Sequence, residues 1–122
     1  MKLDDALRDG MSVDGAIGIA LVDMRSGMLL GKQGGNQLFD LDMAGALNTE
    51  VLRAKLRTMD LLGLNEKIDD ILVTLGSQYH LIRPVTGGSG KGLFMYLALN
   101  RDRANLAMAR HRLRSIERTL EL

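Results

Sequence analysis

The glycine-rich run from Gly87 to Gly92, GGSGKG, comes nearest in this sequence to a known chemistry, the binding of a phosphate by a loop. A phosphate-binding loop requires a glycine five positions before its Gly-Lys pair and a serine or threonine directly after the lysine. Val85 and Gly92 occupy those two positions here. The run also lies between two predicted strands, so no helix N-terminus is expected to receive a phosphate there. The pattern argues against a nucleotide site and predicts a flexible turn.

Histidines, acids and serines lack the spacing that metal binding or nucleophilic catalysis requires. Neither His80 nor His111 has a second histidine or a paired carboxylate at a metal-ligand spacing. Asp69 and Asp70 are adjacent on a predicted strand, where successive side chains point to opposite faces, so we interpret them as charges that protect a sheet edge. The serines fall in predicted turns without a neighbouring base, and there is no cysteine. We therefore expect no enzyme, no metal site and no cofactor.

The C-terminal segment over residues 101–120 is a predicted helix rich in arginine. Its arginines are Arg101, Arg103, Arg110, Arg112, Arg114 and Arg118. Such a helix can bind phosphates or an acidic partner. The arginines are spread around most of the circumference outside the apolar stripe, however, and cations are favourable near a helix C-terminus in any case. A solvated face is the favoured interpretation.

Composition is typical of a globular protein and limits the class of partner. The chain has 122 residues, 46% hydrophobic and 25% charged, so residues 1–122 are expected to form a single domain. Aromatic residues make up only 3%, which predicts an aliphatic core with eight methionines as adaptable filler. A net charge of +1 gives no drive toward nucleic acid. The acidic N-terminal segment and the lack of a long apolar run predict a cytoplasmic protein without a membrane span.

Hydrophobic periodicity predicts an α+β fold with a five-stranded antiparallel sheet. The expected elements are a helix over 1–11, strands over 14–23 and 28–32, a long helix over 40–64, strands over 68–75, 79–85 and 93–100, and the helix over 101–120. Strict alternation in the first strand gives two apolar faces, one with Ile17, Ile19 and Leu21 and one with Ala16, Gly18, Ala20 and Val22. Such a strand belongs in the middle of a sheet. The predicted strand order is second, first, fifth, fourth, third, which leaves the third strand as an exposed edge.

The long helix positions the residues to which we assign a function. Its apolar side chains cover an arc of roughly 200°, about twice what burial on one core requires. One stripe of this arc contains Met43, Leu47, Val51, Ala54, Leu61 and Leu62. The sequence does not decide which stripe faces the protein's own sheet, and the predicted interface follows from placing this one there. The neighbouring stripe is expected to face a second copy of the chain. Burial of that stripe under the N-terminal or C-terminal helix is the alternative.

A homodimer interface is therefore predicted from the second stripe and the edge strand, with helix on helix and edge on edge across a two-fold axis. Gly45 fits this interface because a glycine permits close approach of two helix backbones. The assigned residues are Leu41, Gly45, Asn48, Leu52, Lys55, Leu56 and Met59 of the helix, and Ile71 and Val73 of the third strand.

The order of elements and three segments resemble the roadblock family of dynein light-chain and bacterial homologues. The segments are GAIGIALVDMRSGMLL, IDDILVTLGSQYHLIRPV and LFMYLALNRDRANLAMARHRL, although Asp is expected in place of Asn100. The resemblance covers nearly the whole chain and implies a profilin-like fold, with one long helix on one face of the sheet and two terminal helices on the other. It also implies dimerisation through the long helix and third strand, no cofactor, and a role in regulating small Ras-like GTPases in bacteria.

Three functions are consistent with these features. The leading hypothesis is a non-enzymatic homodimeric scaffold or regulator that binds a small Ras-like GTPase through the paired long helices. The alternative is a structural or signalling adaptor for a partner other than a GTPase, such as a histidine-kinase-linked complex or an acidic protein bound by the arginine-rich helix. A small-molecule sensor is a weaker third hypothesis, because an aliphatic core with few polar residues does not indicate the large internal pocket that a sensor needs. We expect no nucleic acid, membrane or small-molecule substrate as a partner.

Overall fold

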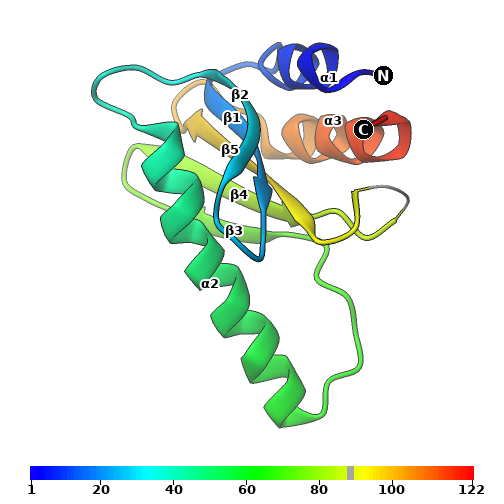
Figure 1. Cartoon of the computed structure of the whole chain (residues 1–122). Coiled ribbons are helices and arrows are strands. Elements are labelled where there is room, and N and C mark those ends of the chain that lie inside the picture. The colour runs from blue at the N-terminus through cyan, green and yellow to red at the C-terminus, as the bar shows by residue number, and fades with distance from the viewer. Residues whose placement is uncertain (88–89) are drawn as a thin grey trace.

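A computed structural model describes residues 1–87 and 90–122 (Figure 1). Within these residues the elements follow the expected order of helix, two strands, helix, three strands, helix. Their bounds are α1 (Leu3–Gly10), β1 (Ala16–Asp23), β2 (Leu29–Gly34), α2 (Leu41–Leu62), β3 (Ile71–Thr74), β4 (Gln78–Pro84), β5 (Leu93–Asn100) and α3 (Leu106–Thr119).

The strands form one antiparallel sheet in the order β2-β1-β5-β4-β3, which confirms the predicted order. β1 and β5 lie side by side in the middle, with Ala20 opposite Tyr96 and Leu21 opposite Met95. β5 is buried from Leu93 to Leu99, as expected of a strand covered on both faces. β2 and β3 are the two edges of the sheet.

β1 is buried on both faces, but the strict alternation predicted for it holds only over its second half. Ile19 packs in the core beneath α1 and α3, and Ala20 packs in the core beneath α2. The pairing with β5 shifts register between Ala16 and Gly18. Ala16 consequently packs with the first core and Ile17 with the second, the reverse of their predicted faces. A register irregularity of this kind exchanges the faces of the residues before it.

Helices cover both faces of the sheet, with α2 on one face and α1 and α3 together on the other (Figure 1). This confirms the layers expected from the family resemblance. Leu7 of α1 and Leu113 of α3 are almost fully buried against one face. Phe94 and Tyr96 lie in the core on the opposite face, beneath α2. No helix of the described residues is long and apolar enough to cross a membrane.

α2 begins and ends at the signals that its sequence carries. The Asp40 carboxylate accepts a hydrogen bond from the backbone N–H of Met43 at 3.1 Å and caps the first turn. Gly63 follows the last residue of the helix with a φ of 72°, a left-handed conformation that glycine adopts without strain. Figure 1 shows that the C-terminal part of α2 projects past the strands.

α3 begins at Leu106, so the prediction of a helix from Arg101 was wrong. Asn105 is the N-cap, because its side chain accepts a hydrogen bond from the backbone N–H of Met108 at 3.1 Å. The arginines that belong to α3 are therefore Arg110, Arg112, Arg114 and Arg118.

The residues between β5 and α3 form a turn with contacts of its own. The Asn100 side chain accepts a hydrogen bond from the backbone N–H of Asp102 at 3.1 Å, a local bond typical of turns. The Arg101 guanidinium lies 5.3 Å from the centre of the Tyr79 ring and donates to the carbonyl oxygen of Leu75 at 2.9 Å. Arg101 is thus anchored on β4 and on the turn before it.

Candidate protein-interaction surface

The side of α2 that faces the sheet is the stripe that we expected to face another copy of the chain. Leu41 and Leu52 are 3% and 0% exposed, and Met59 is 8% exposed. Gly45 is buried in the same row. The predicted orientation of α2 is therefore wrong, because these four residues face the chain's own sheet and not the surface.

A close approach at Gly45 explains this orientation. A Cβ atom at this position would lie 2.6 Å from Leu29 Cδ1 and 3.1 Å from Val22 Cγ2, so the helix backbone rests almost directly on β1 and β2. Thr49 lies on the same inward side of the helix and is 1% exposed. Its hydroxyl donates to the carbonyl oxygen of Gly45 at 2.9 Å, which satisfies the buried group inside the helix. A glycine and a threonine four residues apart are thus the signal that the sequence analysis missed.

One flank of α2 is covered by the turn between β1 and β2. Gly27 lies against Ala46 and Thr49. Arg53 donates a hydrogen bond to the carbonyl oxygen of Arg25 in the same turn. α1 and α3 lie on the far face of the sheet and cover no part of α2 (Figure 1). The alternative in which a terminal helix covers the second stripe is therefore also excluded for the described residues.

The outward side of α2 carries a row of exposed apolar side chains, which we call the outer stripe. Spacings of three and four residues place its members on one side of the helix. Large apolar side chains gathered on a protein surface mark an interaction site more often than single exposed ones do. The outer stripe consists of Met43 (60% exposed), Leu47 (62%), Val51 (42%), Leu61 (82%), Leu62 (66%) and the exposed Ala54.

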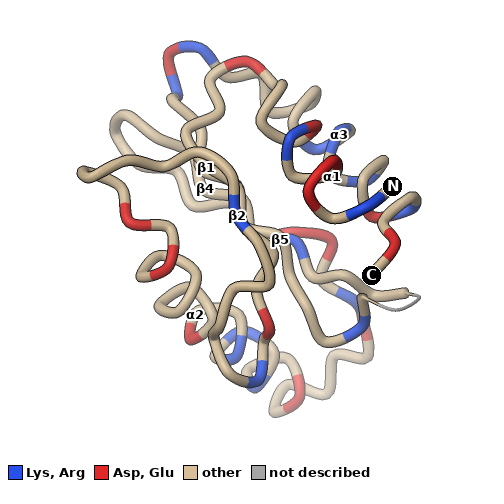
Figure 2. Tube along the Cα trace, turned by 45° about the horizontal axis from the view of Figure 1, so that its top comes forward, with Lys and Arg blue, Asp and Glu red and all other residues tan. Residues whose placement is uncertain are grey.

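α2 carries charged residues of both signs along its length (Figure 2). Glu50 and Arg53 form an ion pair at 3.1 Å, and Asp42 pairs with Lys32 of β2. Exposed ion pairs of this kind contribute little to stability. The outer stripe therefore offers apolar contact area with a polar rim, the composition typical of a protein interface.

The remaining helix residues of the predicted interface lie at the border between the two sides of α2. Asn48 is half-buried, and its side chain donates to the carbonyl oxygen of Ala44 at 2.7 Å. Leu56 is half-buried and packs against the core beneath α2. Lys55 is exposed. Of the helix residues first assigned to the interface, Lys55 is thus the one that the structure leaves on the surface.

β3 is an edge strand, as predicted, although it is shorter than the expected span of 68–75. It pairs with β4 alone among the described strands. Ile71 lies opposite Ile82 and packs in the core beneath α2, and Val73 lies opposite His80. Both β3 residues are half-buried on the α2 side of the sheet. The structure thus places Ile71 and Val73 on the same layer as α2, and the second edge of β3 is available for pairing.

A short chain of polar side chains runs across the α2 face of β4 and β5. The Tyr96 hydroxyl lies 3.0 Å from His80 Nδ1, and His80 Nε2 lies 2.8 Å from Gln78 Oε1. Burial lowers the pKa of His80 and raises the pKa of Tyr96 to about 12, so both are neutral at physiological pH. A neutral imidazole satisfies both contacts when it accepts from Tyr96 and donates to Gln78.

The segments and side chains that the sequence argued against as catalytic, nucleotide or metal sites have other positions or roles in the structure. The run Gly87–Gly92 lies between β4 and β5, with Gly88 and Ser89 outside the described residues. No group of three His, Asp or Glu side chains in the described residues is arranged to hold a metal ion. Asp70 accepts a bidentate pair of hydrogen bonds from Arg110 of α3 at 2.8 and 3.1 Å. Its role is therefore to join the segment before β3 to α3.

Comparison with solved structures finds this fold in bacterial proteins. A Roadblock/LC7 domain from Streptomyces avermitilis superposes with a TM-score of 0.81 over 98% of this chain and 94% of that chain, at 15% identity. MglB of Myxococcus xanthus matches with a TM-score of 0.74 over 93% and 77% of the two chains, at 18% identity. An MglB structure described as having a tetrameric arrangement matches with a TM-score of 0.75 over 93% and 81%, at 15% identity. No protein-family model matches the chain, and no curated protein does. The roadblock fold inferred from the resemblance is confirmed.

The orientation of α2 predicts opposite outcomes for two valine substitutions in the same helix. Gly45→Val places a branched side chain where Leu29 and Val22 leave no room, and we expect it to lower the free energy of unfolding by about 1–3 kcal/mol. Ala54→Val adds the same kind of side chain on the exposed side and should change the free energy of unfolding of the single chain by less than about 0.5 kcal/mol. Urea unfolding followed by circular dichroism measures both. A larger loss for Ala54→Val would show that the helix faces the other way.

The lowered pKa of His80 predicts a pH dependence of stability. The unfolded chain binds a proton near the ordinary pKa of 6.5, whereas the folded chain resists it because His80 is partly desolvated. His80 should therefore contribute its full stability above pH 6.5 and lose part of it as the pH falls through that value toward its lowered pKa. His80→Gln should show a flatter pH profile in urea unfolding than the wild type. His111→Gln, which removes an exposed histidine from α3, is the matched control. If the pH profile of His111→Gln were as flat as that of His80→Gln, the assignment to His80 would be contradicted.

Proposed function

We propose that this chain, which has the roadblock fold, is a non-enzymatic scaffold that forms a homodimer through the outer stripe of α2 and regulates a small Ras-like GTPase through the paired α2 helices. The observation that carries the proposal is the row of large apolar side chains that α2 exposes from Met43 to Leu62. These side chains offer contact area, and none of them can transfer a proton or act as a nucleophile. The function is therefore binding, with any effect on catalysis exerted on the partner.

Self-association through this row follows from symmetry. In a two-fold dimer each residue of the patch meets the same patch of the partner, so a single apolar stripe is complementary to itself. Two copies of α2 that pack through Met43, Leu47 and Val51 would remove from water three apolar side chains that the single chain exposes. The open edge of β3 lies on the same layer and supplies a second contact through Ile71 and Val73. The interface proposed here replaces the buried stripe predicted from sequence.

The GTPase as partner is supported by the family resemblance and by the structural likeness to MglB proteins. The MglB structure with a tetrameric arrangement supports assembly of such folds into oligomers. Pairing of two α2 helices would create a flat platform, wider than one helix, on the face opposite α1 and α3. A GTPase bound to that platform would contact both copies, which explains why regulation would require the dimer.

A matched pair of charge substitutions tests the dimer. Met43 and Met108 are exposed to similar extents, 60% and 55%, and both donate their backbone N–H to an N-cap side chain at 3.1 Å. Asp at this position is favourable to either helix, so neither variant should unfold. We expect light scattering to give a dimer mass for the wild type and for Met108→Asp, and a monomer mass for Met43→Asp. A wild type that remains monomeric at high concentration would overturn the homodimer, and a dimeric Met43→Asp would show that another face associates.

Binding of the GTPase is tested with the same variants. The small Ras-like GTPases encoded in the same genome, each loaded with GDP or with a non-hydrolysable GTP analogue, serve as probes in gel filtration. One of them should co-elute with the wild type and with Met108→Asp but not with Met43→Asp, and its hydrolysis rate should change when the wild type is added. A stable dimer that captures none of these GTPases would support an adaptor for a different class of protein.

A further inference from the structure

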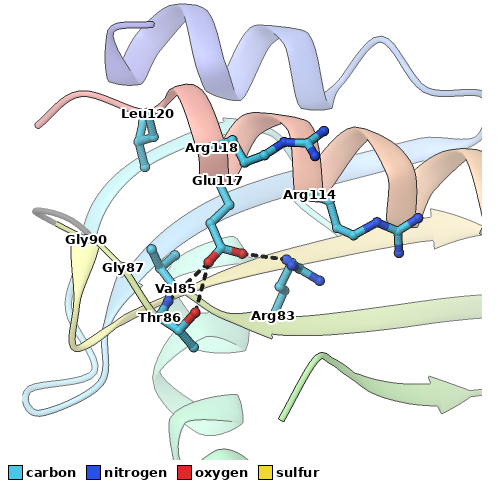
Figure 3. A pocket seen from close by; sticks show the side chains of 9 residues that line it. All are labelled: Arg83, Val85, Thr86, Gly87, Gly90, Arg114, Glu117, Arg118 and Leu120. Atoms are coloured by element: carbon cyan, nitrogen blue, oxygen red, sulfur yellow. Dashed lines mark hydrogen bonds and ion pairs between the residues drawn. The ribbon is translucent and has the colours of Figure 1, made fainter. Parts of the chain in front are cut away.

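A pocket lies between α3 and the segment that follows β4, on the face of the sheet opposite the outer stripe (Figure 3). Its volume of about 480 Å³ falls in the range of small-molecule sites. No pattern in the sequence predicts this pocket, because its walls come from segments that lie far apart in the chain. The residues that line it are Arg83, Val85, Thr86, Gly87, Gly90, Arg114, Glu117, Arg118 and Leu120.

The inner wall is a fixed polar network centred on Glu117. Arg83 Nε donates to Glu117 Oε1 at 2.8 Å, and the backbone N–H and the hydroxyl of Thr86 donate to Oε2 at 3.2 and 3.3 Å (Figure 3). Arg83 and Glu117 are 14% and 15% exposed at their side chains, so this pair is largely shielded from water. Arg83 also donates to the carbonyl oxygen of Asp69 at 3.2 Å. The network holds both charged groups in one conformation.

Two further arginines of the pocket are not held in this way. Arg110 and Arg112 of α3 pair with Asp70 and Asp9. Arg114 and Arg118 are exposed and form no ion pair or side-chain hydrogen bond with any residue that the structure describes. They lie four residues apart on one side of α3, where like charges repel. In Figure 3 the side chains of Arg114 and Arg118 extend from α3 to one side of Glu117, and Val85 and Leu120 lie on its other side.

We propose that this pocket binds the phosphate group of a small phosphomonoester, with Arg114 and Arg118 as its direct ligands. The charged side chains of the lining carry a net charge of +2, which matches a phosphate of about −2 better than a single carboxylate. Guanidinium groups bind phosphate oxygens through paired hydrogen bonds. Val85 and Leu120 provide apolar contact for the carbon part of the ligand. Thr86 and Arg83 already donate hydrogen bonds to Glu117, so they form part of the pocket wall and are not assigned as phosphate ligands.

The binding is tested by titrating the isotope-labelled full chain with inorganic phosphate and with glycerol phosphate at constant ionic strength, followed by amide chemical shifts. We expect saturable shifts confined to Thr86, Gly87 and the last turns of α3. The double variant Arg114→Ala/Arg118→Ala should weaken binding by at least about tenfold, because it removes the charge-assisted hydrogen bonds to the phosphate. Arg103→Ala, which removes an exposed arginine that does not line the pocket, should bind as the wild type does. Equal affinity in the double variant and the wild type would overturn the site.

Glu117→Gln gives a prediction of opposite sign. Removing the carboxylate raises the net charge of the lining, so phosphate should bind more tightly than in the wild type, provided that circular dichroism shows the variant folded. Weaker binding by a folded Glu117→Gln would contradict the assigned electrostatics. A phosphoserine peptide serves as the remaining probe, and binding of that peptide without binding of phosphate or glycerol phosphate would overturn the assignment to a small ligand. Saturable binding of inorganic phosphate, lost in the double arginine variant, would support it.

Discussion

The close contact between the backbone of α2 and the strands beneath it determines what the molecule presents to its surroundings. At Gly45 the helix lies so near Leu29 and Val22 that no other side chain fits without displacement. This contact fixes the rotation of α2 about its own axis. Leu41, Leu52 and Met59 turn inward as a consequence, and the opposite apolar stripe turns outward. The apolar arc of α2 is about twice as wide as burial on one core requires. One half of the arc is therefore buried and the other half is exposed.

The sequence predicted the order of the elements and the order of the strands, because these depend on patterns that are strong locally. The sequence of β5 is an apolar run of the same length as the strand. Asp40 and Gly63 mark the two ends of α2. The orientation of α2 was not predictable from apolar content, because both of its stripes are apolar. It depends on where the smallest side chain meets the sheet, a contact between distant parts of the chain. The register shift near Ile17 and the late start of α3 depend on similar tertiary details.

The two faces of the sheet differ in the kind of surface that they build. The α2 face ends in exposed apolar side chains with few fixed ion pairs. The opposite face is tied together by ion pairs that join distant segments, Arg83 with Glu117, Arg110 with Asp70 and Arg112 with Asp9. None of these pairs was visible in the sequence, since the partners lie up to 103 residues apart. An exposed apolar stripe and an ion-paired pocket therefore lie on opposite faces of a sheet of five short strands.

The placement of the two tyrosines has a practical consequence for spectroscopy. The chain contains no tryptophan, so Tyr79 and Tyr96 dominate its near-ultraviolet absorption and its intrinsic fluorescence. Tyr79 lies beneath Arg101 and packs with the core under α1 and α3, whereas Tyr96 bonds to His80 in the core under α2. Each layer of the molecule thus contains one natural chromophore. Single Tyr→Phe variants would separate the two signals, and the loosening of either layer could be followed optically without a label.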